Sequence, residues 1–187
     1  MRAFVALPLP DGLVEWMRTN RGAYASALPK LTLVPLSSCH ITLRFLGELP
    51  GDKIDDVIER LKMWLPALPE STVTLDRYGM FYRDGRPAVF WIGPSTVPQR
   101  LADLVTKIDL CLSGLGSNNR TERFAPHVTL GRFAAGTLAS EVAEIRAVPL
   151  EPLVVPVTDV FLYESVMGQG HPVYVTHGSV RLAPVAE

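Results

Sequence analysis

Two short segments of this chain share one pattern, and together they restrict the possible fold more than any other feature. Residues 40–43 are His-Ile-Thr-Leu and residues 127–130 are His-Val-Thr-Leu. Their β-branched and apolar neighbours predict a strand for each segment. Because alternate residues of a strand face the same side, each segment would present an imidazole and a hydroxyl together, with its apolar residues turned to a core. The two segments use two of only four histidines in the chain.

The elements predicted around these segments form a weak repeat. Hydrophobic periodicity and turn residues predict, in order, strands or helices over residues 2–7, 11–17, 31–34, 40–45, 52–65, 72–77, 87–92, 101–115, 127–132, 138–147 and 153–180, with a loop over 116–122. The order helix, motif strand, helix, further strands occurs once before residue 95 and once after it. We therefore expect an α+β fold: a duplicated α/β unit with two antiparallel sheets facing a central cleft, pseudo-twofold symmetric, each lobe contributing one His-x-Thr strand. No linker rich in Gly or Ser divides the chain, which predicts a single bilobal domain over residues 1–187.

Composition limits the class of protein. The chain has 187 residues, 48% of them hydrophobic and 20% charged, which is typical of one folded domain. A net charge of −1 argues against a broad basic surface that grips long nucleic acid, although a local basic pocket is compatible with it. No apolar run approaches the roughly 18 residues of a membrane span, so we expect no membrane partner. Two cysteines predict a reduced, cytoplasmic protein.

Two facing His-Thr pairs suit the cleavage of a phosphodiester. In-line cleavage needs a base on the attacking oxygen and an acid on the leaving oxygen, at opposite sides of phosphorus. Two imidazoles supply both without a metal, because histidine titrates near neutral pH. The threonine hydroxyls would hydrogen-bond the non-bridging oxygens, where negative charge develops.

The motifs and their flanks resemble the 2H phosphoesterases, in particular their RNA 2′,3′-cyclic phosphodiesterase branch, also called 2′-5′ RNA ligases. The resemblance rests on four segments spread over nearly the whole chain: MRAFVA at residues 1–6, HITLRFLG at 40–47, FAPHVTLGR at 124–132 and LYES at 162–165. It implies a bilobal α+β fold with the site between the lobes, no metal or other cofactor, and opening of a 2′,3′-cyclic phosphate to a 2′-phosphomonoester. It also implies that His40 is the general acid on the 3′ oxygen and His127 the general base on water, although the near-symmetry of the motifs leaves the two roles interchangeable. Thr42 and Thr129 carry over as phosphate-binding residues.

Three further residues are candidate substrate contacts. A basic residue five positions after the second histidine is frequent in the family, which points to Arg132. Strict alternation puts Arg132 on the wrong face, but a bulge at Gly131 would turn it toward the site. Its counterpart in the first repeat, Phe45, either stacks on a nucleobase or packs in the core. Arg44 shares the parity of His40 and Thr42, which makes it a second cationic candidate.

Simpler interpretations stand beside these assignments. Strand propensity alone explains a threonine, and Arg132 can be a solvated charge. His171 and His177 have no threonine two residues later and are interpreted as structural, as are Tyr163 and Glu164. The histidines lack metal-ligand spacing, so no metal site is expected. Cys39 would point away from His40, which argues against a Cys-His nucleophile.

Three functions remain possible from the sequence. The first is metal-independent hydrolysis of RNA 3′ ends that carry a 2′,3′-cyclic phosphate, or of small cyclic nucleotides. The second is the same chemistry in reverse, which joins such an end to a 5′-hydroxyl in a 2′-5′ bond. The third is a nucleotide- or RNA-end-binding module without catalysis. In each case we expect the protein to be a monomer.

Overall fold

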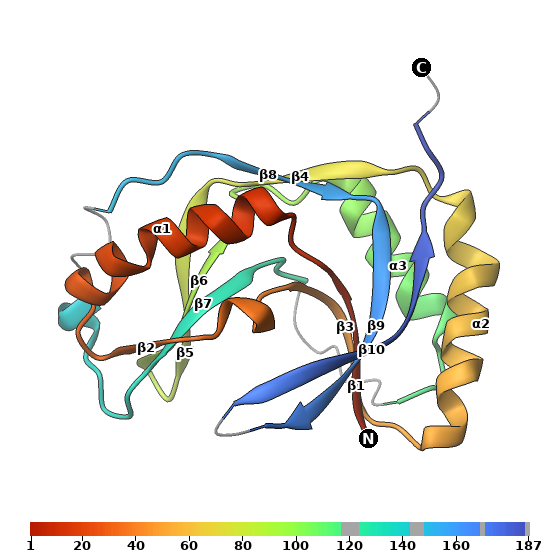
Figure 1. Ribbon diagram of the computed structural model, residues 1–187, viewed down its shortest axis with the longest axis horizontal. Helices are drawn as coiled ribbons and strands as arrows, with labels where there is room; N and C mark the ends of the chain where they lie inside the picture. Colours follow the sequence, from red (N-terminus) through yellow and green to blue (C-terminus); the bar gives the residue numbers. More distant parts are fainter. Residues whose placement is uncertain (117–123, 143–147, 169–170, 186–187) are drawn as a thin grey trace.

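A computed structural model gives the architecture of the chain (Figure 1). It describes residues 1–116, 124–142, 148–168 and 171–185. The helices are α1 (Asp11–Ala27), α2 (Ile54–Trp64) and α3 (Gln99–Cys111), with short 3₁₀ turns η1 (Leu36–Ser38), η2 (Gly51–Lys53) and η3 (Leu65–Ala67). The strands are β1 (Arg2–Leu7), β2 (Leu31–Leu33), β3 (Ile41–Glu48), β4 (Ser71–Leu75), β5 (Arg77–Arg83), β6 (Arg86–Gly93), β7 (Val128–Phe133), β8 (Leu153–Val157), β9 (Asp159–Met167) and β10 (Pro172–Arg181).

Most strands belong to one large antiparallel sheet. Its order is β10-β9-β1-β3-β7-β6-β5, and β2 pairs with β7 at the side of this path. The two motif strands, β3 and β7, are central neighbours joined by one residue pair, Ile41 opposite Val128. We call the half with β1, β3, β9 and β10 the first lobe, and the half with β2, β5, β6 and β7 the second lobe. The predicted α+β class with antiparallel sheets is confirmed, but the expectation of one sheet for each motif strand is wrong, because this pair connects both strands in one sheet.

The second sheet is small and contains no motif strand. It consists of β4 and β8, which pair antiparallel from Ser71–Leu75 to Leu153–Val157. Figure 1 shows it at the top of the view, above the place where the lobes meet. The chain passes through β4 on its way to β5 in the second lobe, and through β8 on its way to β9 in the first. Each lobe therefore takes strands from both halves of the sequence, which a simple repeat along the chain does not predict.

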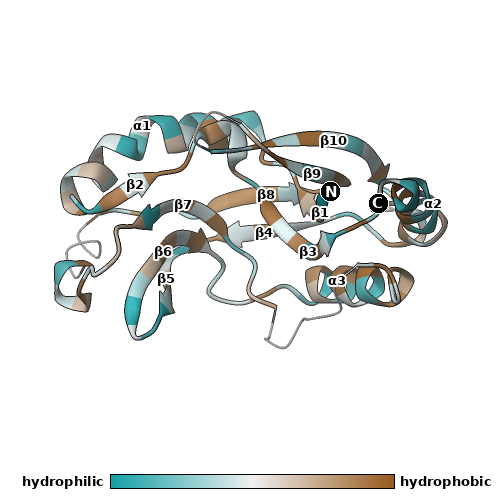
Figure 2. Cartoon of the chain, turned by 90° about the horizontal axis from the view of Figure 1, so that it is seen from below, coloured by the Kyte–Doolittle hydropathy of each residue, from teal (hydrophilic) through white to brown (hydrophobic). Residues whose placement is uncertain are grey.

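Helices pack against the two ends of the large sheet. Figures 1 and 2 place α2 and α3 together at one end and α1 at the other. The predicted apolar positions of α2 are its buried ones, Ile54, Val57, Ile58 and Leu61. Helix α1 buries Tyr24, whose ring contacts Tyr78 and Phe90 of the second lobe at 5.8 and 5.7 Å. The amphipathic periodicity thus predicted correctly which helix faces are covered by the sheet.

Several element boundaries differ from the sequence-based expectation. Strand β5 is a separate strand beyond the predicted 72–77 segment. The predicted helix over 138–147 appears as a single 3₁₀ turn at 139–142, and its remainder lies outside the described residues. Most of the predicted loop over 116–122 lies outside them as well. None of the described helices is long and apolar enough to span a membrane.

Candidate active site

The pair that joins the two lobes also sets the position of both motifs. Ile41 and Val128 are fully buried and face the core. The residues directly before and after Ile41 and Val128 point to the opposite face of the sheet. Because the strands are antiparallel, the residue before Ile41 lies opposite the residue after Val128, and the reverse. His40 therefore lies across from Thr129, and Thr42 lies across from His127. The four predicted side chains meet on one face, at the junction of the lobes.

His40 is held by its own turn and by aromatic rings. Its Nδ1 lies 2.9 Å from the Ser38 carbonyl oxygen, and its Nε2 lies 3.0 Å from Thr42 Oγ1. Because a carbonyl only accepts, Nδ1 must carry the proton of the neutral ring. Phe4 and Tyr174 contact the imidazole at ring-centroid distances of 4.8 and 5.0 Å. Nε2 is then the atom that can take up or release a proton.

His127 repeats this arrangement in the second lobe. Its Nδ1 lies 2.8 Å from the Ala125 carbonyl oxygen, again two residues earlier in the chain. Phe81 meets the ring edge-on at 4.7 Å, and Trp91 lies 6.1 Å away. The same tautomer follows, with Nε2 as the proton-exchanging atom. Both motifs therefore fix their imidazole in the orientation that general acid–base catalysis requires.

Both imidazoles are neutral at pH 7. Burial lowers the pKa of His40 to about 4, against an opposing hydrogen bond to Ser38 and with a further lowering from nearby His127. Burial also lowers the pKa of His127, opposed by the Ala125 carbonyl and reinforced by the positive charge of Arg132. The effect of His127 on His40 shows that the two rings share one electrostatic environment. An anion between them would stabilise the protonated forms.

A bulge at the same place in both motif strands redirects the residues that follow. In β3 the register against β1 skips Leu43, and in β7 the register against β6 skips Leu130. Each bulge reverses the alternation, so that Phe45 and Arg132 return to the histidine face. Phe45 is 65% exposed and lies 6.0 Å from the Phe4 ring. The alternative prediction that Phe45 packs in the core is therefore wrong.

The same bulge turns Arg44 away from the site. Its side chain is buried, and its guanidinium donates to the Asp109 carbonyl and carboxylate and to the Leu112 and Leu115 carbonyls. These acceptors lie at the end of α3, where helix carbonyls lack partners within the helix. The prediction that Arg44 shares the face of Thr42 is wrong, because alternation does not continue through the bulge. Arg44 instead ties β3 to α3.

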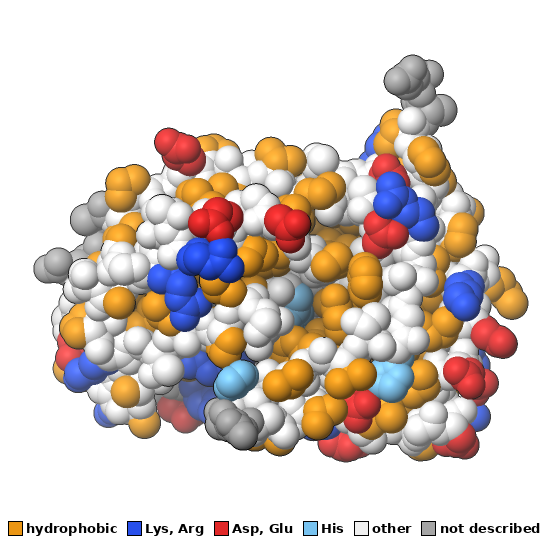
Figure 3. All heavy atoms as spheres, viewed as in Figure 1, with side chains coloured by type: hydrophobic (Ala, Val, Ile, Leu, Met, Phe, Trp, Pro, Cys, Tyr) orange, Lys and Arg blue, Asp and Glu red, His pale blue; other side chains and the backbone are white. Residues whose placement is uncertain are grey.

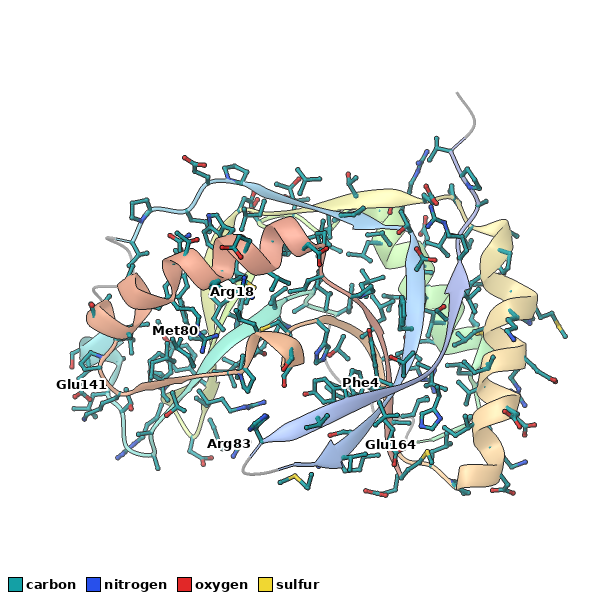
Figure 4. All side chains as sticks on the ribbon, viewed as in Figure 1. Phe4, Arg18, Met80, Arg83, Glu141 and Glu164 are labelled. Atoms are coloured by element: carbon teal, nitrogen blue, oxygen red, sulfur yellow. The ribbon has the colours of Figure 1, made fainter. Side chains whose placement is uncertain are left out.

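Aromatic residues form part of the site that the sequence did not reveal. Phe4 and Tyr174 contact His40, and Tyr163 stacks on Phe4 at 5.5 Å. Figure 4 shows Phe4 on β1, near the centre of the molecule. Figure 3 shows this face hollowed at its centre, with histidine atoms at the base of the hollow and hydrophobic side chains around it. Aromatic residues are ordinary in strands, so no pattern distinguished these positions.

The remaining candidates lie apart from this face. His177 on β10 pairs with Glu164 on β9, with Nε2 and Oε2 2.9 Å apart. Burial raises the pKa of the Cys39 thiol to about 11, so this cysteine stays protonated. Among the described residues, no group of three His, Cys, Asp or Glu side chains lies close enough to hold a metal ion. A separate surface hollow of about 580 Å³, lined by Thr72, Arg100 and Thr158 among others, contains none of the predicted residues.

Comparisons with known proteins agree on one family. Residues 9–169 match the model of the 2′-5′ RNA ligase superfamily. An RNA 2′,3′-cyclic phosphodiesterase of Thermotoga maritima is 32% identical over 143 residues, covering 76% of this chain and 75% of the relative. A protein of the same name from Geobacillus stearothermophilus is 29% identical over 88% of this chain, which spans only 52% of that relative's length.

Solved structures show the same likeness. The apo crystal structure of Escherichia coli LigT superimposes with a TM-score of 0.75 at 25% identity, and its complex with 3′-AMP with a TM-score of 0.76 at 27% identity. Each covers 97% of both chains. The likeness therefore extends over both lobes and the junction between them.

Proposed function

Because the chain belongs to the 2′-5′ RNA ligase superfamily, we propose that it is a hydrolase that opens 2′,3′-cyclic phosphates at RNA ends, or in small cyclic nucleotides, to 2′-phosphomonoesters. The observation that carries this proposal is the pair of imidazoles at the lobe junction. Each has Nδ1 bound to a backbone carbonyl and Nε2 left for proton transfer. The relatives named RNA 2′,3′-cyclic phosphodiesterase and the binding of 3′-AMP by E. coli LigT support the substrate class.

The proposed reaction needs no metal. His127 Nε2 accepts a proton from water, whose oxygen attacks phosphorus in line with the 3′ oxygen. The bond from phosphorus to the 3′ oxygen breaks, and His40, which must enter the reaction as the imidazolium with a proton on each ring nitrogen, gives its Nε2 proton to that oxygen. Thr42, Thr129 and Arg132 hold the non-bridging oxygens as charge builds on them. The crosswise placement of the two motifs supports this division, since it puts one histidine at each side of a phosphate seated between them.

The domain assignments are part of the same proposal. We treat residues 1–187 as a single bilobal domain, pseudo-twofold symmetric about the Ile41–Val128 pair, because both motifs repeat the same carbonyl contact and the same bulge. Cys39 and Cys111 are free thiols, which fits the reducing cytoplasm. A monomer suffices for the reaction, since both lobes come from one chain.

The test of the function is direct. Protein would be incubated in excess EDTA with an oligoribonucleotide ending in a 2′,3′-cyclic phosphate, and the product separated against 2′- and 3′-phosphate standards. We expect a 2′-phosphate end. A 3′-phosphate would contradict the assigned leaving group, and joined RNA at modest concentrations would favour ligation. Saturable binding without turnover from pH 4 to 9 would favour a binding module.

The lowered pKa values of the histidines predict an acidic optimum. The productive form has one imidazole protonated and the other neutral, and it is most populated between the two pKa values. Burial lowers the pKa of His40 to about 4 and lowers the pKa of His127 from its usual value. We therefore expect kcat/KM for 2′,3′-cyclic AMP to be highest at acidic pH and to fall as the pH rises above about 6.5. An optimum above pH 7.5, with thermal unfolding confirming a folded protein at every pH, would contradict this protonation scheme.

A further inference from the structure

The β5–β6 hairpin carries three exposed arginines. Arg77, Arg83 and Arg86 are exposed, and none forms an ion pair with a carboxylate in the part of the chain that the structure describes. Other arginines do form such pairs, including Arg18 with Glu15 and Arg181 with Asp159. We call Arg77, Arg83 and Arg86 the arginine row. Within the row, Arg77 donates to the Pro94 carbonyl and its charge acts on the Asp76 carboxylate, whereas Arg83 and Arg86 form no such contact among the described residues.

Two members of the row oppose each other directly. Arg83 and Arg86 are register partners across the end of the hairpin. Like charges at directly opposed strand positions repel and destabilise the pair. Figure 4 shows Arg83 at the free end of this hairpin, on the side away from helix α1. Asp84 lies between them in the turn but is not within ion-pair distance of either guanidinium, so an anionic ligand would relieve this repulsion further.

The row begins next to His127. Arg77 lies over the Trp91 ring, 5.2 Å from its centroid, and Trp91 is 6.1 Å from the imidazole of His127. Phe81, between Arg77 and Arg83 on the same face of β5, contacts that imidazole at 4.7 Å. Arg77 and Arg83 are six residue steps apart along β5, or about 20 Å. The row therefore extends outward from the site over more than one nucleotide.

Close packing keeps this surface flat beside the site. A Cβ at Gly79 would lie 2.1 Å from the Trp91 ring, and one at Gly93 would lie 2.9 Å from it. The indole thus rests on two glycines, one on β5 and one on β6. Arg132 lies on the neighbouring strand, opposite Val89, which is itself opposite Phe81. Arginine and aromatic side chains alternate along this face, as they do on surfaces that bind single-stranded nucleic acid.

The first lobe offers a different surface. Around His40 it presents the uncharged rings of Phe45, Tyr163 and Tyr174, packed on the buried ring of Phe4. A cyclic phosphate between the histidines has a terminal nucleoside attached, and every further phosphate of the RNA lies on the 5′ side of that nucleoside. Aromatic rings suit the terminal base, and the arginine row suits the phosphates.

We infer that the arginine row binds the phosphodiester backbone of single-stranded RNA immediately 5′ of the terminal nucleoside, so that the protein favours oligonucleotide ends over mononucleotides. This inference rests on the proposed function and adds a direction to it. The 5′ strand runs along the second lobe, and the terminal base lies against the first lobe.

The test compares two substrates that share the same reacting end. KM and kcat would be measured for 2′,3′-cyclic AMP and for a ten-residue oligoadenylate ending in a 2′,3′-cyclic phosphate. For the variant Arg83→Ala/Arg86→Ala we expect KM of the decamer to rise about tenfold with kcat unchanged. Both KM and kcat for 2′,3′-cyclic AMP should stay within about twofold of wild type. The slope of log affinity against log salt should fall by about 1.4, because two phosphate contacts are lost.

Controls separate charge, position and catalysis. Lys62→Ala/Lys107→Ala removes two charges from α2 and α3 and should leave KM and kcat for both substrates unchanged. Arg83→Lys/Arg86→Lys keeps the charge and should restore most of the decamer's affinity. Phe45→Ala should raise KM for both substrates, since both carry the terminal base.

Binding provides a readout that does not depend on turnover. Fluorescence anisotropy of a labelled decamer ending in a 2′-phosphate should show the same loss of affinity in Arg83→Ala/Arg86→Ala. If this variant and wild type bound the decamer with equal affinity, or if the variant lost as much affinity for the mononucleotide as for the decamer, the proposed role of the arginine row would be overturned. Absence of turnover in wild type with intact, row-dependent binding would instead count against the proposed reaction and leave the row supported.

Discussion

His40→Ala and His127→Ala are each expected to lower kcat for a 2′,3′-cyclic phosphate by about 10²–10⁴-fold, the usual contribution of one proton transfer. Each variant removes the only imidazole on its side of the phosphate. Neither should weaken the fold much, because both rings lie on the face of the sheet away from the core that Ile41 and Val128 fill. Steady-state hydrolysis of 2′,3′-cyclic AMP measures the loss, and thermal unfolding checks the fold.

His171→Ala is the matched control, since His171 is exposed and lies at the β9–β10 connection outside the site. It should keep wild-type kcat. The double variant His40→Ala/His127→Ala should be little slower than the worse single variant, because residues that act together in one step are not additive. Near-normal turnover in either single variant would refute acid–base catalysis by that residue.

Arg44→Ala is expected to destabilise the protein by about 3 kcal/mol, although Arg44 touches no part of the proposed substrate. The variant leaves the Leu112 and Leu115 carbonyls without this donor and removes the ion pair between Arg44 and Asp109. For a chain of this length, 3 kcal/mol corresponds to a fall in Tm of roughly 6–12 °C. Thermal or urea unfolding followed by circular dichroism measures it.

Two variants qualify this result. Arg44→Lys should recover only part of the stability, because an ammonium group cannot reach several acceptors in the planar geometry of guanidinium. Arg2→Ala removes an exposed arginine whose nearest carboxylate, that of Glu48, is 4.0 Å away, and it should change Tm little. A Tm shift under 2 °C for Arg44→Ala would show that Arg44 does not secure β3 to α3.

The sequence was most informative where the chemistry repeats. The two His-x-Thr segments predict the strands and the shared face, because strand pleating follows from backbone geometry. The family prediction also needed their flanks and the segments at residues 1–6 and 162–165. The expected alternation of side chains along β3 does not hold beyond Thr42. It predicted Arg44 on the face of the site and left the position of Phe45 undecided. A bulge depends on how the neighbouring strand pairs, and β1 lies far from β3 in the sequence. For the same reason the aromatic rings around His40, which come from β1, β9 and β10, could not be grouped beforehand.

Sequence patterns could not predict which strands form each lobe. Similar halves suggested two units, each closed on itself, but β7 of the second half lies beside β6 of the first, and β1 lies between β3 and β9. Local periodicity describes which face of an element is buried and not which distant element buries it. The predicted elements were therefore more accurate than their partners.

Within the large sheet, the lobes meet at a single rung, Ile41 opposite Val128. Each histidine is fixed rigidly to its own lobe by a backbone carbonyl, so the separation of the two imidazoles depends on the angle at that rung. A rotation of one lobe against the other at that rung would change the distance between the imidazoles, while the carbonyl contact of each imidazole within its own lobe would stay the same. Two apolar residues without any chemistry of their own thus set the spacing between acid and base.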